Sequence, residues 1–277
     1  MHFSSYPVFS YCLALFLLAG PTGVFAQTIT AEKILEMVNA QQEINLTNTT
    51  IEGDLDFTQL DNKREENTGG DRQAFRSTVD VPLSFTGCTF TGKVLGFVND
   101  DGGWSKSDEP IYHANFSEEV VFTACKFKED VDFKYSVFRE RADFHDSEFR
   151  RYANFKYTEI RRAADFRNVV FQNEANFKYT EFSRSPTFDN AVFEDLANFK
   201  YTELNDGVSF ANCIFRREAS FKYTDLGGDV SYAGAQFKGE ADFKYVKFPR
   251  GTDLTNTSFG RYTDFKYATL DGKKFRR

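Results

Sequence analysis

The chain has 277 residues, a formal net charge of −7 and an apolar fraction of 41%, which exclude a collagen-like or an intrinsically disordered chain. The acidic balance favours solubility and argues against nonspecific nucleic-acid binding, which needs a basic surface. Phenylalanine is the compositional outlier, with 33 residues against 2 methionines and 1 tryptophan. Such an excess of one large apolar residue indicates a single structural position that is repeated many times.

The first 26 residues contain no acidic residue, lysine or arginine. An apolar run from Val8 to Gly20 is followed by Val24-Phe25-Ala26, the small-x-small pattern of a secretory cleavage site. We therefore expect residues 1–26 to be a signal peptide. The mature chain would be secreted or lie in the periplasm or cell envelope, with no membrane span after cleavage. Because no lysine or arginine precedes the apolar run, retention as a membrane anchor stays open.

Residues 27–44 contain a short amphipathic segment that we expect to be a helix. Thr30 is a suitable N-cap, and Ile34, Leu35 and Val38 form an apolar stripe at helical spacing. A repeat protein exposes an open strand edge at its first repeat, and terminal caps cover such edges. We therefore assign this helix a capping role.

The remainder, residues 45–277, is expected to form one repeat domain with two interruptions. Polar, glycine-containing stretches lie near 61–77 and 98–110, and we expect both to be loop insertions. Asp100-Asp101-Gly102 in the second stretch lacks the spacing of acidic residues that a calcium loop requires. Loops on a repeat scaffold both tolerate insertion and carry binding, so both roles stay open.

The repeat itself is unusually regular. The tripeptide Phe-Lys-Tyr recurs every 22 residues, beginning at Phe133, Phe155, Phe177, Phe199, Phe221, Phe243 and Phe265. From Phe116 to Leu270, large apolar residues, mostly phenylalanine, are spaced alternately by 5 and 6. A small residue precedes each by two positions, and residues two apart on an extended chain point the same way. Four sides per 22 residues predict a square coil whose strands stack about 4.8 Å apart; a three-sided, pectate-lyase-like helix is the alternative.

Two segments, Ala-Asn-Phe-Lys-Tyr at 153–157 and Ala-Asp-Phe-Lys-Tyr at 241–245, carry a family resemblance. The pattern resembles the pentapeptide-repeat family, over residues 114–272 and less regularly over 46–97. The resemblance implies an all-β fold, a right-handed quadrilateral parallel β-helix. Spacing by 5 and 6 departs from the family ideal of 5, and we interpret the extra residue as a wider turn at two corners of each coil.

Three cysteines of the expected mature chain, Cys88, Cys125 and Cys213, occupy the small inward position. Cys125 and Cys213 lie four coils apart on one side, about 19 Å at 4.8 Å per coil, which excludes a disulfide between them. Carrying the register back across the second interruption places Cys88 directly beneath Cys125. That separation is marginal for a disulfide, so a bridge and two buried free thiols both stay open.

If each phenylalanine points inward, the lysine and tyrosine that follow it point outward and stack along the solenoid. They could be structural ladders, in which lysine stems cover apolar surface. They could also form an aromatic and basic strip that binds an extended ligand, such as a cell-wall or matrix polysaccharide. The candidate binding residues are Tyr157, Tyr179, Tyr201, Tyr223, Tyr245, Lys156, Lys178, Lys200 and Lys222.

No motif points to catalysis. We find no Ser/His/Asp signature, phosphate-binding loop or CxxC, and nothing selects a carboxylate pair for sugar chemistry. His113 and His145 do not belong to a metal-like cluster in the sequence. We therefore expect no enzymatic activity, no cofactor and no metal site.

The sequence thus predicts an exported, noncatalytic scaffold that binds an unidentified protein or polysaccharide through its solenoid surface. The family resemblance adds an alternative, because some pentapeptide-repeat proteins resemble duplex DNA and bind DNA gyrase. The export signal and the lysine column oppose that alternative. The last residues, Asp271 to Arg277, supply no apolar cap, so an end-to-end homodimer is a further expectation.

Overall fold

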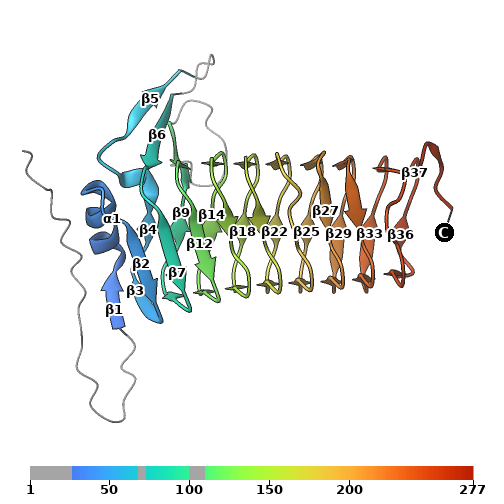
Figure 1. Cartoon of the computed structure of the whole chain (residues 1–277), viewed down its shortest axis with the longest axis horizontal. Helices are drawn as coiled ribbons and strands as arrows, with labels where there is room; N and C mark the ends of the chain where they lie inside the picture. The colour runs from blue at the N-terminus through green and yellow to red at the C-terminus, as the bar shows by residue number, and fades with distance from the viewer. Residues whose placement is uncertain (1–26, 68–72, 100–109, 277) are drawn as a thin grey trace, which may run out of the picture.

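The computed structural model describes residues 27–67, 73–99 and 110–276. The expected signal peptide lies outside the described residues, as do 68–72 and 100–109 of the two interruptions. The described chain winds into a long four-faced solenoid with a helix at its N-terminal end (Figure 1). The predicted right-handed parallel β-helix is confirmed. Within the described ranges, no helix has the length and apolar character needed to cross a membrane.

Each coil is held by the coils on both sides through backbone hydrogen bonds. The Phe155 N–H donates to the Asn176 carbonyl at 2.8 Å, and the Glu159 N–H donates to the Ser136 carbonyl at 3.0 Å. The strand pairs keep the 22-residue offset of the sequence, as in Ala153 opposite Ala175. Equivalent side chains therefore lie directly above one another along the whole repeat.

The first face is a ten-stranded sheet. Its strands are β1 (Gln27–Thr30), β3 (Thr49–Glu52), β8 (Thr89–Phe90), β13 (Lys126–Phe127), β17 (Glu148–Phe149), β21 (Val170–Phe171), β24 (Val192–Phe193), β28 (Ile214–Phe215), β32 (Gln236–Phe237) and β35 (Ser258–Phe259). The first member was not expected from the sequence: β1 pairs in parallel with β3 just before the helix begins.

The second face contains the strands that follow each Phe-Lys-Tyr tripeptide in the sequence. Its strands are β5 (Arg64–Glu66), β6 (Ala74–Val79), β10 (Phe97–Asn99), β11 (Ile111–Phe116), β15 (Val137–Phe138), β19 (Glu159–Ile160), β23 (Glu181–Phe182), β26 (Glu203–Leu204) and β30 (Asp225–Leu226). A three-stranded sheet continues the same repeat positions at the C-terminal end, with β34 (Lys247–Phe248), β37 (Thr269–Leu270) and β38 (Lys273–Lys274).

The other two faces complete the square. The third face contains β2 (Ile44–Thr47), β7 (Leu83–Thr86), β12 (Val120–Thr123), β16 (Ala142–Asp143), β20 (Ala164–Asp165), β27 (Gly207–Ser209) and β31 (Asp229–Ser231). The fourth contains β4 (Leu55–Asp56), β9 (Val94–Leu95), β14 (Val131–Asp132), β18 (Ala153–Asn154), β22 (Ala175–Asn176), β25 (Ala197–Asn198), β29 (Glu218–Ser220), β33 (Glu240–Asp242) and β36 (Thr263–Asp264). A short 3-10 helix, η1 (Phe57–Gln59), follows β4.

The core consists of aromatic columns that run along the axis. In one column, Phe155, Phe177 and Phe199 stack with centroids 5.0 and 4.9 Å apart and planes within 6° of parallel. Rings in neighbouring columns meet edge to face, as do Phe155 and Phe166 at 5.5 Å and 88°. Each fully buried phenylalanine contributes roughly 1.5–3 kcal/mol relative to exposure, and favourable ring contacts add to this. The core explains the phenylalanine excess without any ligand.

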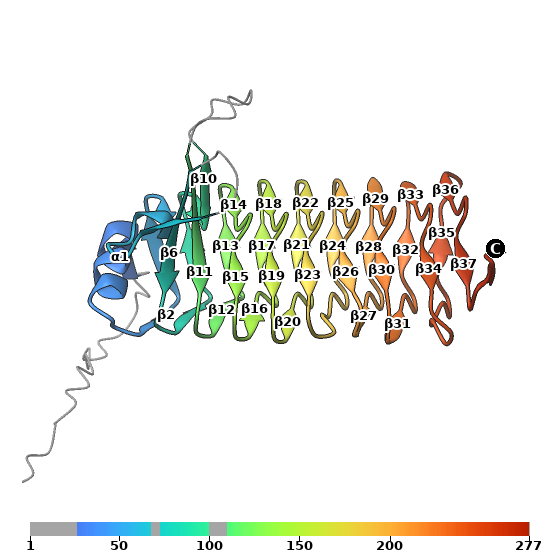
Figure 2. The same cartoon turned by 90° about the horizontal axis from the view of Figure 1, so that it is seen from above.

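Helix α1 (Ala31–Asn39) covers the N-terminal coil (Figure 2). The Thr30 hydroxyl accepts a hydrogen bond from the Lys33 N–H at 3.2 Å, which satisfies one of the free donors of the first turn. Ala31, Ile34 and Val38 are buried on the core side. Leu35, assigned above to the apolar stripe, is only partly buried.

The two expected loop insertions contain strands in their described parts. β5 pairs antiparallel with β6, and β6 then pairs in parallel with β11 along its full length. β10 pairs antiparallel with β11 at the start of the second interruption. The expectation of loops is wrong for 64–66, 74–77 and 98–99. Backbone groups of β6 and β10 pair with the long strand β11, and those of β5 pair with β6; this arrangement has no counterpart in the repeat.

Candidate functional site

The predicted tyrosines lie at one corner of every coil from Phe133 onward. The Thr158 N–H donates to the Phe155 carbonyl at 3.1 Å, closing a four-residue turn whose third residue is Tyr157. Tyr157 has a φ of 60°, and the other ladder tyrosines have φ values of 57–64°. Residues with a Cβ rarely adopt this left-handed conformation, which type II turns reserve mainly for glycine or asparagine.

The opposite corner of the coil shows what such a turn ordinarily uses. There the left-handed position holds Asn168, Asn190 and Asn212, with φ of 57–61°, and later Gly234. The asparagine amides bond from coil to coil, as in the Asn190 Nδ2 donating to the Asn168 Oδ1 at 3.1 Å. Earlier coils place Ala124 and Asp146 at the same position, with φ of 53° and 60°. From Asn168 onward, the tyrosine corner therefore accepts backbone strain that the opposite corner reduces with asparagine or glycine.

The tyrosine ladder is defined here as the stack of rings from Tyr135 to Tyr267. Successive ring centroids lie 4.5–5.0 Å apart, with interplanar angles of 2–24°. Favourable aromatic pairs contribute about 0.5–1.5 kcal/mol each, which offsets the cost of the left-handed turn. The ladder comprises Tyr135, Tyr157, Tyr179, Tyr201, Tyr223, Tyr245 and Tyr267, and thus includes all five predicted tyrosines.

Stacking determines which part of each ring meets solvent. The faces of the inner rings pack against one another, so the ladder presents ring edges and hydroxyls to solvent instead of ring faces. The inner ladder residues are 36–40% exposed, whereas Tyr267 at the end of the stack is 60% exposed. A partner would therefore meet a row of hydroxyl-bearing edges at the spacing of the coils.

The predicted lysines form a column beside the tyrosine ladder. The ammonium nitrogens of Lys156, Lys178 and Lys222 lie 4.8–5.1 Å from the centroid of the ring that follows each of them. Lys200 departs from this pattern and lies within electrostatic range of the Glu174 carboxylate. Burial lowers the pKa of Lys156 and the neighbouring Lys178 charge lowers it further, as a stacked row of cations requires.

On the other side of the ladder, the second face presents a column of carboxylates. Glu159, Glu181 and Glu203 pair in register on β19, β23 and β26, and Asp225 continues the column on β30. Partial burial raises the pKa of Glu181, and the carboxylates above and below raise it further. The ladder therefore runs between a row of positive and a row of negative charges.

A shallow groove of about 410 Å³ lies beside the C-terminal half of the ladder. It is lined by Tyr223, Thr224, Asp225, Tyr245, Lys247 and Tyr267. Asp225 and Lys247 were not among the predicted binding residues. The 22-residue repeat could have identified them, because both occupy the second position after a ladder tyrosine.

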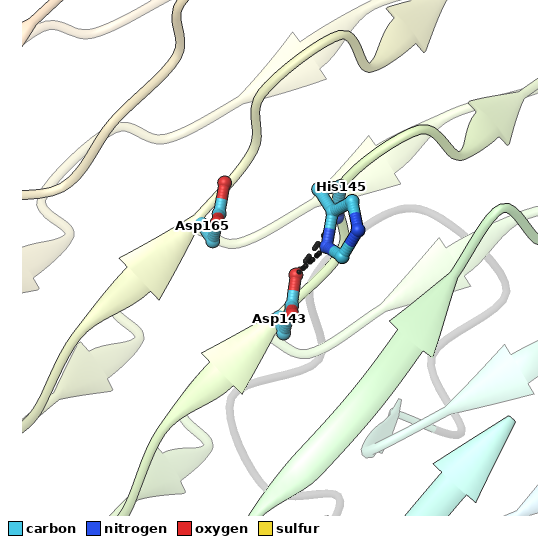
Figure 3. Close-up of side chains that lie close together, drawn as sticks. All are labelled: Asp143, His145 and Asp165. Carbon is cyan, nitrogen blue, oxygen red and sulfur yellow. Dashed lines mark hydrogen bonds and ion pairs between the residues drawn. The ribbon is translucent and has the colours of Figure 1, made fainter. Parts of the chain in front are cut away.

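A second cluster brings together three groups with metal-ligating side chains. Ligand atoms of Asp143, His145 and Asp165 lie within 4.8 Å of one another (Figure 3). His145 Nδ1 lies 2.7 Å from Asp143 Oδ1. The expectation that His145 belongs to no such cluster is therefore wrong. The spacing Asp143-x-His145, with Asp165 22 residues after Asp143, was the available signal.

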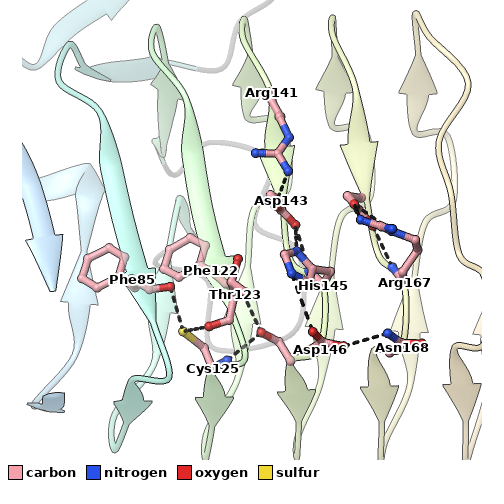
Figure 4. A network of polar contacts seen from close by, with 12 residues as sticks. Phe85, Phe122, Thr123, Cys125, Arg141, Asp143, His145, Asp146, Arg167 and Asn168 are labelled. Carbon is pink, nitrogen blue, oxygen red and sulfur yellow. Dashed lines mark hydrogen bonds and ion pairs between the residues drawn. The ribbon is translucent and has the colours of Figure 1, made fainter. Parts of the chain in front are cut away.

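Two arginines already neutralise this cluster. Arg141 pairs with Asp143 (Figure 4), and Arg167 pairs with Asp165 at 2.7 Å. Burial opposes ionisation of Asp165, but the hydrogen bonds from Arg167 outweigh it and lower the pKa of the carboxyl. A cation would have to displace both guanidinium groups, so we interpret the cluster as a charge-compensated ladder on the third face.

The three cysteines of the repeat have free thiols. Pairing of Thr89 with Lys126 confirms that Cys88 lies directly beneath Cys125. The neighbouring Cys125 thiol lowers the pKa of Cys88 to about 7 despite burial, and the same contact raises the pKa of Cys125.

The thiols of Cys125 and Cys213 also bond to backbone carbonyls of the core. Cys125 Sγ donates to the Phe85 carbonyl at 3.3 Å (Figure 4), and Cys213 Sγ donates to the Phe188 carbonyl at 2.9 Å. At the same inward position of the coil, the Ser147 hydroxyl donates to the Phe122 carbonyl at 2.5 Å. These cysteines thus take the place of a buried hydroxyl donor.

Comparison with known proteins agrees with this geometry. A family model described as pentapeptide repeats (9 copies) matches residues 111–159, 155–203, 199–247 and 222–269. Proteins built from these repeats are generally noncatalytic scaffolds. No curated protein and no solved structure matches the chain.

Proposed function

The chain belongs to the pentapeptide-repeat family, and from that membership we propose that it is a noncatalytic scaffold that binds an extended polymer outside the cytoplasm. The binding surface is the tyrosine ladder with the lysine column beside it. The single observation that carries the proposal is the ladder itself, in which each coil places a partly exposed tyrosine at a strained turn. Strained backbone conformations are often kept where a side chain serves a function.

The geometry of the surface favours a polymer over a small molecule. Ring edges and hydroxyls recur every 4.5–5.0 Å along a straight row, and the groove beside Tyr223 and Tyr245 continues in the same direction. Tyrosine hydroxyls both donate and accept hydrogen bonds, and lysines add up to three donors each. A polysaccharide offers hydroxyl and ring-oxygen partners at regular intervals, so it matches this surface better than a compact ligand does.

Removal of three central tyrosines tests the proposal. Tyr179, Tyr201 and Tyr223 would be changed together to asparagine, which the opposite corner of the same coil accepts at left-handed φ. We expect the triple variant to keep its circular dichroism spectrum and to lose cosedimentation with insoluble cell-wall or matrix polysaccharide. The matched control changes Asn168, Asn190 and Asn212 to glycine and should bind as the parent does. Equal binding by the parent and the tyrosine variant would rule out the ladder as the binding surface.

Export is the second part of the proposal. The apolar run from Val8 to Gly20 and the Val24-Phe25-Ala26 pattern support it. We expect the mature protein to begin at Gln27 and to occur in the secreted, periplasmic or envelope fraction. N-terminal sequencing after cell fractionation measures both. An intact Met1 in the cytoplasmic fraction would contradict this part and leave the polymer-binding test unaffected.

The alternative function is mimicry of duplex DNA and binding to DNA gyrase. The carboxylate column of the second face favours it, because its charges recur at every coil from Glu159 to Asp225. The adjoining lysine column interrupts a continuous negative surface, so we rank this function second. Inhibition of gyrase supercoiling by the purified protein would place it first.

A further inference from the structure

We propose that the tyrosine ladder is a site of oxidative modification, at which hydrogen peroxide acting through a haem peroxidase joins tyrosines of adjacent coils as dityrosine. This inference concerns the covalent chemistry of the ladder and does not depend on the polymer-binding proposal. It rests on the separation of the phenol rings, their exposure and their near-parallel stacking in successive coils.

The rings are held ready for coupling. Tyr157 and Tyr179 lie 4.8 Å apart with planes within 2° of parallel, and Tyr223 and Tyr245 lie 4.5 Å apart. Because successive rings share one turn geometry, each ring carbon beside the hydroxyl lies next to its equivalent on the following coil. Holding two reactants together in this way turns a bimolecular coupling into an intramolecular one.

The exposure of the ladder allows oxidation from solvent. The rings are 36–60% exposed, and the hydroxyl-bearing edges form the solvent side of the stack. A peroxidase or a small diffusing oxidant can therefore remove an electron at any coil. In the core columns behind the ladder, the phenol of the described chain is that of Tyr232, which stacks on Phe210 and is only 1% exposed, so oxidation from solvent is directed to the outer row.

The reaction balances with peroxide as the oxidant. Each of two phenols loses one electron and its hydroxyl proton, giving two phenoxyl radicals. The radicals combine at the carbons ortho to the oxygens, and one carbon–carbon bond forms. Both ortho C–H bonds then break, and the protons return to the oxygens, which restores two phenols. One hydrogen peroxide takes up the two electrons and two protons and is reduced to two water molecules.

The other tyrosines of the described chain lack this arrangement. Tyr232 is buried in the core and Tyr112 stacks on Phe75. The Tyr152 hydroxyl accepts a hydrogen bond from the Asn176 side chain at 2.7 Å, and Tyr262, although 68% exposed, contacts Arg261. Over residues 27–67, 73–99 and 110–276, ring contacts between two tyrosines occur only within the ladder. Tyr262 therefore serves as an internal control for an exposed phenol without a tyrosine neighbour.

Two triple variants test the proposal. Tyr157→Phe, Tyr201→Phe and Tyr245→Phe remove every second phenol, so that no two ladder tyrosines remain adjacent. Tyr135→Phe, Tyr157→Phe and Tyr179→Phe remove the same number but leave Tyr201 to Tyr267 contiguous. Phenylalanine keeps the ring and the turn, so both variants should fold, which circular dichroism verifies. The proteins are treated at high dilution with hydrogen peroxide and a haem peroxidase, and dityrosine is measured by fluorescence in the monomer band.

We expect the parent and the contiguous variant to form dityrosine, with linked peptides that pair neighbouring coils by mass spectrometry. The alternating variant should form roughly tenfold less, because proximity supplies the advantage. Equal yields from the two variants would overturn the proposal. So would an absence of dityrosine in the parent, or links found only between molecules or at Tyr262.

Discussion

Asp132 places a carboxylate at a repeat position where the next two coils have the amide side chain of asparagine. Its side chain accepts hydrogen bonds from the Lys134 N–H at 2.9 Å and from the Asn154 Nδ2 at 3.0 Å. On the next coils the equivalent positions are Asn154 and Asn176. Their amide oxygens accept hydrogen bonds from the equivalent backbone N–H groups, those of Lys156 and Lys178. Burial raises the pKa of Asp132 to about 6, although these hydrogen bonds partly counteract it.

The raised pKa of Asp132 predicts a pH-dependent stability. A carboxyl group whose pKa is higher in the folded state stabilises the fold fully below its unfolded pKa, and this contribution is lost as the pH rises through the folded value near 6. Asp132→Asn removes the ionisation and keeps an acceptor for the Lys134 N–H. We expect the variant to match the parent near pH 3.5 and to exceed its free energy of unfolding by about 1–2 kcal/mol at pH 7.5.

Urea denaturation of both proteins across this pH range measures the difference. A variant that loses stability at pH 7.5 would show that the charge of Asp132, through Lys134, contributes more than its burial costs.

At the scale of the element, the tight turn at one corner of each coil positions the tyrosine ladder on the surface. Each coil has two tight corners, and the same left-handed φ is occupied by tyrosine at one and by asparagine or glycine at the other from Tyr157 onward. Asparagine tolerates this conformation because its short amide bonds locally, whereas tyrosine requires support from the rings above and below. The two corners therefore stabilise the same left-handed backbone conformation with different side-chain contacts: ring stacking at one corner and amide hydrogen bonds at the other.

Substitution of Asn190 tests the role of the turn. Asn190→Ala places a Cβ without a bonding side chain at a φ of 61°, and we expect it to destabilise the protein by about 1–2 kcal/mol. Asn190→Gly loses the same amide bonds but accepts the conformation, so its loss should be smaller. Urea denaturation compares the two. If the glycine variant were the less stable, the greater conformational freedom of glycine in the unfolded chain would outweigh the relief of strain at the left-handed φ.

Much of the repeat element could be predicted from the sequence, for a physical reason. The 22-residue period and the alternation of 5 and 6 place every phenylalanine inside and every Phe-Lys-Tyr lysine and tyrosine outside, and the structure keeps that register. The face-to-face stacking of the tyrosines could not be predicted, because it depends on side-chain torsions. The antiparallel pairings of β5 with β6 and of β10 with β11 could not be predicted either, since they lie in the two segments that interrupt the repeat pattern.

At the scale of the whole molecule, stability spreads along the stack of coils. A repeat protein is stabilised by contacts between neighbours, so an interior coil has two interfaces and a terminal coil has one. Phe177 is fully buried between Phe155 and Phe199, whereas Phe259 near the C-terminal end is only partly buried. The same substitution should therefore have different costs at the two positions.

We expect Phe177→Ala to reduce the free energy of unfolding by about 3–5 kcal/mol, the usual cost of emptying a buried aromatic site. Phe259→Ala should cost less than about half as much, because its ring is already partly exposed. Chemical denaturation followed by circular dichroism measures both. Equal costs would indicate that the last coil is as well protected as the middle.

The direction of the strand pairing gives the molecule a mechanical polarity. Hydrogen bonds between coils lie along the solenoid axis, and β35 and β36 end their sheets at the C-terminal side, opposite the covering helix α1. A force that separates the two ends loads these bonds one coil at a time. Under such a force, coils should unfold one after another from the C-terminal end, and each coil of 22 residues should release about 70 Å of chain. Such a solenoid would resist a steady force poorly, but it would absorb the energy of a sudden pull through many unfolding steps of equal length.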